Sequence, residues 1–460
     1  MIRVLMIADG GWPTGFERVA RGIGTYLQST GRFEVVHRGL GYGDAKQSRV
    51  APYPYEIKPI RRELGDPLGV KAIPDVLAED RPDVVLFIQD IWNQVNYLGY
   101  TPRDIPTVGY YPVDTPNLKW AYAMAAASLT EAVPYTQFGA HETALGVREA
   151  VDIVVGSQDA ANRRKLATWI TLPHDDMQLH LRLDRMAARQ NVGAYRPIPH
   201  GVDKALFSPM DKQVARKTFG LPDNAFVVLN VNSNQFRKRQ DITIRAFARF
   251  AQDRPEAVLL LHSAGGNERE GWDLSQLATL YGVQDRVLMV HHFKPQLSDE
   301  ELNHLYNAAD VQVNTGGGEG WGLTAVDGAL CGIPQLVPDW SATREIWKDH
   351  GVLLPVSDYR FEPKYLNTAH ALVDVQQCAN RLAYLADNPD IRLGIGTACR
   401  ERALTLPTWD EVGKQFEQRI TSALMAPAPT PMSLEQLRTA RNGELRSELL
   451  DWDISRQAAK

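Results

Sequence analysis

The glycine-rich stretch NTGGGEGWGLTAVDGALCGIP, residues 314–334, contains two carboxylates that could take part in chemistry. Glu319 stands among glycines just after the apolar strand pattern VQVNT, and a helix pattern begins near Gly322. Open parallel sheets bind ligands beyond the carboxyl ends of their strands, and glycines let backbone approach a ligand closely. The N–H groups of Gly322 and Leu323 would face an anion at the helix N-terminus. A plain tight connection would have the same composition, so this stretch alone leaves both interpretations open.

The second carboxylate, Asp327, falls on a helix that should belong to the core. At helical spacing Leu323, Val326 and Leu330 share one face, and Asp327 lies at its edge. A buried carboxylate is costly unless hydrogen-bond donors surround it. Backbone groups or an arginine of the same chain could supply these donors, and so could the vicinal diol of a ribose.

A cluster of cations is predicted at the same edge of the sheet. Arg237, Lys238 and Arg239 follow the strand pattern FVVLNVN, whose carboxyl end should lie beside that of VQVNT. Loop cations are commonly only solvated. Cations, a helix N-terminus and two acids in one place together favour a ligand that carries phosphates, a sugar and a ribose.

The surrounding elements alternate between short apolar runs and helical patterns, which predicts an α/β fold with parallel, doubly wound sheets. This rhythm occurs twice, and Pro and Gly gather between the two halves at residues 196–209. The last stretch, from about 367 to 424, is predicted to be helical. We therefore expect a Rossmann-like domain over 1–200 with a charged helical insertion at 157–195, a second Rossmann-like domain over 201–400, a closing helix over 401–424, and a Pro-rich break with a polar tail over 425–460.

Length and composition agree with a two-domain globular protein. The 460 residues are 44% hydrophobic and 23% charged, and the formal net charge of −5 gives no overall attraction to nucleic acid or anionic lipid. Three scattered cysteines fit neither a metal site nor a disulfide framework, which indicates a reducing compartment. No segment reaches the length of a membrane span. The expected location is the cytoplasm, with a peripheral position at a membrane surface left open.

These motifs resemble the donor half of the retaining GT-B glycosyltransferases, specifically glycosyltransferase family 4. The resemblance rests on EGWGLTAVD, in which two acids bracket Gly-aromatic-Gly, and it extends over most of the chain. TGFERVARGIGTYL is similar to the family's first loop and helix, IPHGVDKALFSP to its interdomain segment, and FRKRQDITIRAFARF to its Arg-Lys helix. The implied fold is GT-B: two Rossmann-like domains face a central cleft, and the C-terminal helix crosses back.

The resemblance implies roles for individual residues. Glu319 would hold hydroxyls of the donor sugar, Asp327 the ribose, and Lys238 the departing diphosphate, with no metal ion. The remaining donor-binding residues would be Gly15, Arg237, Arg239, Phe293, Gly320, Trp321, Gly322, Leu323 and Thr324. Phe293 could flank the base or belong to the core.

Four departures from the family pattern affect these assignments. The second acid is Asp rather than Glu, and Asn232, Ser233 and Asn234 stand where an Arg is usual, so that Arg237 or Arg239 would have to replace it. Phe16 replaces a glycine and leaves Gly15 alone.

The fourth departure concerns the catalytic centre. Asp114, in YYPVDTP, stands where the family has a histidine. This carboxylate could accept a proton from the acceptor hydroxyl, or it could merely begin the turn at Thr115-Pro116. Asp90 is a second candidate in the same cleft. The predicted catalytic set is therefore Asp114, Glu319 and Lys238.

The sequence thus predicts a metal-independent, retaining, hexosyltransferase-type glycosyltransferase with no cofactor, whose co-substrate is a UDP- or GDP-linked sugar. A sugar-nucleotide epimerase and a non-catalytic nucleotide- or glycan-binding relative remain as alternatives. The acceptor (lipid, glycan, protein or modified nucleobase) and a homo-oligomeric state stay open. Basic residues of the insertion, including Arg185 and Arg189, could dock an acceptor or simply be solvated.

Overall fold

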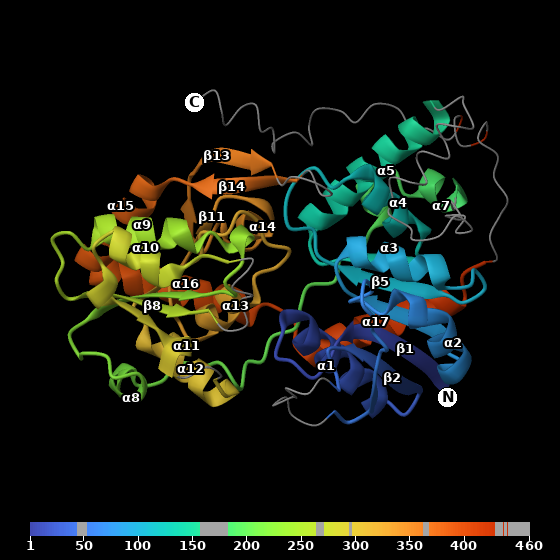
Figure 1. Ribbon diagram of the computed structural model, residues 1–460, viewed down its shortest axis with the longest axis horizontal. Coiled ribbons are helices and arrows are strands. Elements are labelled where there is room, and N and C mark those ends of the chain that lie inside the picture. Colours follow the sequence, from blue (N-terminus) through green and yellow to red (C-terminus); the bar gives the residue numbers. More distant parts are fainter. Residues whose placement is uncertain are drawn as a thin grey trace.

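The computed structural model describes residues 1–43, 53–156, 183–263, 271–293, 297–361 and 368–427, together with Gln436 and Thr439. These residues form two lobes, each built on a six-stranded parallel sheet, as the sequence predicts (Figure 1). The segment 196–209, which connects the lobes, contains no helix or regular strand. Among the described residues no helix is both long and apolar enough to cross a membrane.

The first lobe has the strand order β3-β2-β1-β4-β5-β6. Its central strands are buried along nearly their whole length, because helices cover both faces of the sheet. The strands are β1 (Ile2–Asp9), β2 (Phe33–Leu40), β3 (Glu56–Pro59), β4 (Val84–Ile88), β5 (Thr107–Tyr111) and β6 (Glu131–Pro134). The helices are α1 (Gly15–Ser29), η1 (Val70–Ala72), α2 (Ile73–Asp80), α3 (Ile91–Tyr100), α4 (Trp120–Ser128), α5 (Gln137–Gly156), α7 (Leu183–Ala188) and η2 (Val192–Ala194).

The second lobe has the strand order β12-β11-β10-β7-β8-β9. Its strands are β7 (Phe226–Val231), β8 (Ala257–His262), β9 (Val287–Met289), β10 (Val311–Val313), β11 (Gln335–Pro338) and β12 (Val352–Leu354). Its helices are α8 (Lys212–Thr218), η3 (Phe236–Lys238), α9 (Gln240–Phe250), α10 (Leu274–Leu280), η4 (Gln284–Arg286), α11 (Val290–Phe293), α12 (Asp299–Ala308), α13 (Leu323–Leu330), α14 (Ser341–Trp347), α15 (Val375–Asp387) and α16 (Pro389–Leu404). Because β10 lies beside β7, the loops that follow these two strands are neighbours.

The last described helix, α17 (Trp409–Leu424), returns to the first lobe, where it packs on α1 and lies against β4, β5 and β6 (Figure 1). A capping box formed by Thr408 and Glu411 starts this helix. Gly413 lets Tyr26 of α1 approach closely, since a Cβ added there would lie 2.3 Å from the tyrosine ring. One apolar cluster includes Ile23, Trp321 and Phe416, so the two lobes share part of their core.

Two local predictions are wrong. Residues 369–373 form the strand β14 (Ala369–Val373), which pairs antiparallel with β13 (Val356–Phe361), although 367–424 was predicted to be helical. The alternation of buried and half-buried residues in β14 is the period of a strand with one face packed. The second wrong prediction concerns the apolar run RVLMVHHF, residues 286–293, which the alternation of apolar runs and helices predicts to be one strand. In the structure β9 ends at Met289 and a short helix follows.

Candidate active site

The loop between β10 and α13 is held by backbone bonds to two other segments. Gly317 donates its N–H to the carbonyl of Arg237 over 2.8 Å, and the Gly317 carbonyl accepts from the N–H of Ala371 over 2.8 Å. Gly322 has a φ of +91° at the N-cap of α13, a left-handed conformation that favours glycine. The predicted helix start near Gly322 is therefore confirmed.

Two glycines of this loop are required by the opposite lobe. A Cβ on Gly318 would lie 2.3 Å from Cγ2 of Thr115 and 2.4 Å from the carbonyl oxygen of Asp114. A Cβ on Gly320 would lie 2.3 Å from Cβ of Pro112. The sequence leaves two interpretations of the glycine-rich stretch open, close approach of a ligand and a tight connection. In the structure these two glycines let the strand-end segment of the first lobe contact the second lobe.

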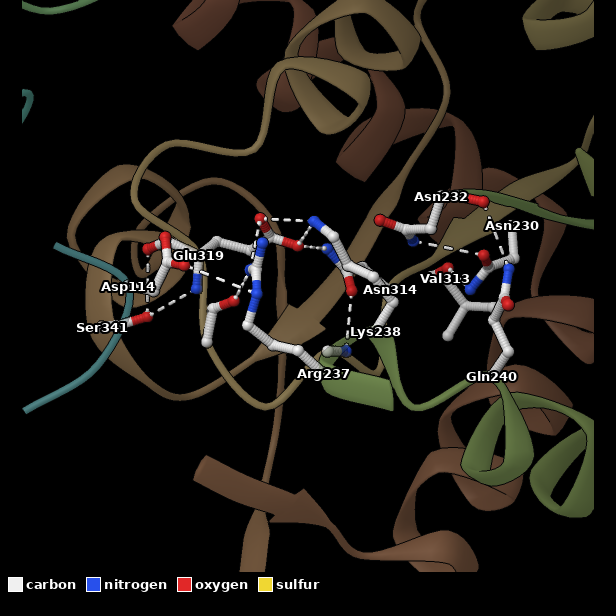
Figure 2. Close-up of polar contacts among 12 residues, drawn as sticks. Asp114, Asn230, Asn232, Arg237, Lys238, Gln240, Val313, Asn314, Glu319 and Ser341 are labelled. Carbon is white, nitrogen blue, oxygen red and sulfur yellow. Dashed lines mark hydrogen bonds and ion pairs between the residues drawn. The ribbon is translucent and has the colours of Figure 1, made fainter. Parts of the chain in front are cut away.

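Glu319 is the centre of a buried polar cluster (Figure 2). Lys238 donates to both of its carboxylate oxygens, over 2.6 and 2.8 Å, and Asn314 donates to one of them over 3.3 Å. Burial by itself would raise the pKa of Glu319, but Lys238 and Arg237 outweigh it and the pKa is lowered. Burial also lowers the pKa of Lys238, and the Glu319 charge opposes that shift.

Arg237 joins this cluster to the first lobe. Its Nε lies 3.4 Å from a carboxylate oxygen of Asp114, and its Nη1 lies 3.5 Å from a carboxylate oxygen of Glu319 (Figure 2). Burial disfavours its charge, but the two carboxylates outweigh burial and raise the pKa of Arg237. The structure thus brings together four predicted residues: Asp114, Lys238 and Glu319 of the catalytic set, and Arg237 of the donor-binding set.

Both carboxylate oxygens of Asp327 accept hydrogen bonds from one residue, Arg18, which is not among the predicted site residues. Arg18 of α1 donates to both carboxylate oxygens, over 2.6 and 3.1 Å, and Asp327 is only 3% exposed. Burial raises the pKa of Asp327, and Arg18 opposes the shift. Of the partners considered for this buried carboxylate, an arginine of the same chain is the one present. It comes from the other lobe.

Arg239 and Trp321 lie elsewhere than the donor assignment expects. Arg239 forms a bidentate pair with Asp241, over 2.9 and 2.7 Å, instead of facing Glu319. Trp321 is 5% exposed, and its ring centroid lies 5.4 Å from that of His200. His200 is itself hydrogen-bonded to the hydroxyl of Tyr110 over 2.7 Å. These aromatic residues therefore form part of the packing between the lobes.

The other predicted donor residues are placed as follows. A Cβ on Gly15 would lie 3.5 Å from Cδ1 of Leu323, so the starts of α1 and α13 face each other across the lobes. The carbonyl of Thr324 accepts from Nε2 of Gln312 over 3.1 Å. The backbone of Phe293 ends α11, and its side chain lies outside the described part of the structure.

Sequence reasoning missed several residues that connect this region. Ser341 Oγ accepts from the N–H of Glu319 over 3.2 Å. Glu345 of α14 accepts from the N–H groups of Gln137 and Phe138, over 3.1 and 2.7 Å, at the start of α5 in the opposite lobe. The sequence carries no signal for Arg18, because charged residues are usual on an amphipathic helix such as α1. It carries none for Glu345 either, because the partners of Glu345 are backbone groups.

The proposed docking role of the insertion is not supported by the part that is described. Arg185 donates to the carbonyl of Ser128 over 2.8 Å. Arg189 donates to the carbonyls of Ala126, Ala127, Leu129 and Thr130, over distances between 2.7 and 3.1 Å. Both arginines therefore cap the C-terminal end of α4. Residues 157–182 lie outside the described residues.

Comparison with known proteins supports a glycosyltransferase relationship. Residues 211–364 match the family model of glycosyl transferases group 1. A D-inositol 3-phosphate glycosyltransferase of Acidothermus cellulolyticus is 34% identical over 160 residues, which cover 32% of this chain and 35% of that protein. The corresponding protein of Thermobispora bispora is 31% identical over 230 residues, which cover 49% of each chain. The chain thus spans at most about half the length of these relatives.

Solved structures show the fold over nearly the whole chain. Sucrose-phosphate synthase from Thermosynechococcus elongatus has a TM-score of 0.59 at 20% identity, covering 92% of this chain and 98% of its own. HepE of Anabaena, in complex with UDP, has a TM-score of 0.60 at 17% identity, covering 92% and 100%. The molecule has the GT-B fold, and it resembles glycosyltransferase family 4.

Proposed function

We propose that this chain, a GT-B protein with a glycosyl transferases group 1 domain, moves a sugar from a nucleotide-sugar to an acceptor hydroxyl with retention of anomeric configuration. The observation that carries the proposal is the buried cluster of Lys238, Arg237 and Glu319 at the N-terminal side of α13, with Asp114 of the opposite lobe beside it. Matched relatives named as glycosyltransferases support the reaction class.

In the proposed reaction the acceptor oxygen forms a bond to the anomeric carbon. The bond from that carbon to the diphosphate oxygen breaks, and the nucleoside diphosphate leaves with the electron pair. Lys238 and Arg237 stabilise the charge that develops on it, because fixed cations in a buried site need no reorganisation. Glu319 holds hydroxyls of the sugar, and Asp114 takes the proton of the acceptor hydroxyl or stabilises the positive charge on the sugar ring.

We propose UDP as the nucleotide, because a solved structure of the same fold, HepE, is described in complex with UDP-glucose. Transfer is proposed to proceed without a metal ion, since Lys238 and Arg237 supply positive charge where the diphosphate would lie. Gly15, Gly320, Gly322, Leu323 and Thr324 would contribute backbone to the donor site. The sugar is expected to be a hexose.

Release of nucleoside diphosphate from UDP-glucose, UDP-N-acetylglucosamine, UDP-galactose and GDP-mannose tests the proposal. We expect release from at least one donor, unaffected by EDTA, and a loss of two or more orders of magnitude in Glu319→Gln. Glu300→Gln, an exposed glutamate of α12, is the matched control and should keep the rate of the unmodified protein. Conversion of the sugar without release would indicate an epimerase, and binding without release would indicate a non-catalytic relative.

A further inference from the structure

Three carboxylates gather at the carboxyl edge of the first sheet. Asp9 ends β1, Asp90 follows β4 and Asp114 follows β5. The strand register pairs Ala8 with Ile88 and Ile88 with Tyr110, so these three acids lie at the ends of adjacent strands. The edge faces the second lobe, because Asp114 contacts Arg237 there.

The positive charge at this edge is insufficient for the three acids. Asp9 accepts from two neutral groups, Thr14 Oγ1 and Gln89 Nε2, each over 2.7 Å. Asp114 shares Arg237 with Glu319. Among the residues that the structure describes, Asp90 has no side-chain partner, and no lysine or arginine of the first lobe pairs with any of the three acids. Burial and the charge of Asp114 raise the pKa of Asp90, and the charge of Arg237 opposes this shift, so a further positive charge beside Asp90 would favour its ionised form. A diphosphate bound by Arg237 and Lys238 would offset the charge of Arg237, which is the positive charge that acts on Asp90.

Tyr135 provides an independent indication of a ligand. It follows β6, is 4% exposed, and its hydroxyl has no hydrogen-bond partner in the described structure. Its ring is fixed against those of Tyr110 and His200, with centroids 4.3 and 4.2 Å apart. Tyr135 directly follows Pro134, which pairs with Tyr111 of β5, so it lies at the same edge of the sheet as Asp114. A buried hydroxyl without a hydrogen-bond partner destabilises the protein, and a ligand that hydrogen-bonds to it would remove this cost.

The chemistry of this edge suits an organic cation better than a metal ion. No group of three His, Cys, Asp or Glu side chains among the described residues is arranged to hold a metal. Carboxylates together with a tyrosine hydroxyl and the amide of Gln89 can bind ammonium and hydroxyl groups. A phosphate here would face carboxylates, and repulsion between like charges in a buried site disfavours its binding.

We propose that the acceptor is a polyol that carries an ammonium group, such as an amino sugar, bound with the ammonium at Asp90 and the reacting hydroxyl at Asp114. This inference rests on the proposed function and names the acceptor class of the same site. It separates this chain from the relatives named for inositol 3-phosphate, which is an anion.

Calorimetry with UDP-saturated protein tests the inference with glucosamine, glucose and glucose 6-phosphate as probes at pH 7. Glucosamine should bind about tenfold or more tightly than the other two, because a charge-assisted hydrogen bond contributes about 1.5–3 kcal/mol. Asp90→Asn should remove most of this preference by weakening the binding of glucosamine. The exposed Asp104→Asn is the matched control and should keep the preference.

Equal or tighter binding of glucose 6-phosphate, or no detectable binding of glucosamine at millimolar concentration, would overturn the inference on the unmodified protein alone. A preference that persists in Asp90→Asn would overturn the role of that residue. UDP is titrated first: failure of UDP to bind contradicts the proposed function, whereas UDP binding with the opposite sugar preference contradicts only the acceptor class.

Discussion

Arg18 and Asp327, which are 309 residues apart in the sequence, form a bidentate ion pair between the two lobes. The pair joins α1 of the first lobe to α13 of the second, the helix that follows the loop with Glu319. Both oxygens of Asp327 are used, so a ribose diol can reach this carboxylate only if Arg18 moves or shares it. Nucleotide binding at Asp327 would therefore change a contact between the lobes.

Breaking this pair should destabilise the protein. Arg18→Met keeps the apolar stem beside Phe207, which the guanidinium overlies at 5.1 Å, but leaves a buried carboxylate without its partner. We expect a loss of about 3 kcal/mol in the free energy of unfolding measured with urea. The double variant Arg18→Met with Asp327→Leu should recover much of it.

The surface pair Arg3–Glu34 is the control, since the two side chains are 37% and 41% exposed. Arg3→Met should change the free energy of unfolding little, because exposed ion pairs contribute little to stability. An effect of Arg18→Met as small as that of the control, or no recovery in the double variant, would show that the cross-lobe pair contributes little.

Asp114→Asn should lower kcat more than it weakens donor binding. Its proposed role begins after the donor is bound, and an amide cannot accept the proton. Transfer kinetics and UDP titration should give a kcat loss of about a hundredfold or more with a UDP Kd changed less than about threefold. Equal losses in both would assign Asp114 to donor binding through Arg237 instead.

The fold could be predicted from the sequence because strands and helices leave their patterns in short, local segments of the chain. Buried parallel strands appear as continuous apolar runs, and helices appear between them, so both sheets could be inferred from periodicity. The short hairpin of β13 and β14 was missed, because five residues with one packed face resemble a helix segment when judged by apolar content alone.

The candidate site was predictable only in part. Lys238 and Glu319 follow neighbouring strands of one sheet, and topology alone brings them together. Arg18, Glu345 and the glycine contacts with residues 112–115 depend on how the two lobes meet, which no spacing within one lobe encodes. Arg239 was predicted to lie at the donor site but does not face Glu319, because Asp241, two residues further along the chain, pairs with its guanidinium group.

The buried His200 should make stability depend on pH. Burial, to which the charge of Arg18 adds, lowers the pKa of His200 to about 3, so the folded protein keeps this ring neutral. The unfolded chain takes up a proton below about pH 6.5, and the contribution to stability is therefore full above that pH and is lost as the pH falls towards 3. The free energy of unfolding, measured with urea, should decrease between pH 7 and pH 5. This decrease should be about 2 kcal/mol smaller in His200→Gln than in the unmodified protein.

His292, which is exposed, provides the control for that comparison. In His292→Gln the free energy of unfolding should decrease between pH 7 and pH 5 by as much as in the unmodified protein. Burial also lowers the pKa of His37, His262 and His370, which therefore contribute to the pH dependence as well. The difference between the variants is thus the informative quantity. An unchanged slope in His200→Gln would mean that this ring is not held neutral.

The central claim is that Lys238 binds the diphosphate of a nucleotide-sugar, and titration of UDP into Lys238→Met and the unmodified protein tests it most directly. Lys212→Met is the control, because Lys212 pairs with Asp310 away from Glu319. We predict that Lys238→Met weakens UDP binding by about tenfold or more, with a reduced dependence on salt, while the control binds as the unmodified protein does. Equal UDP affinity and salt dependence in Lys238→Met and the unmodified protein would contradict the account.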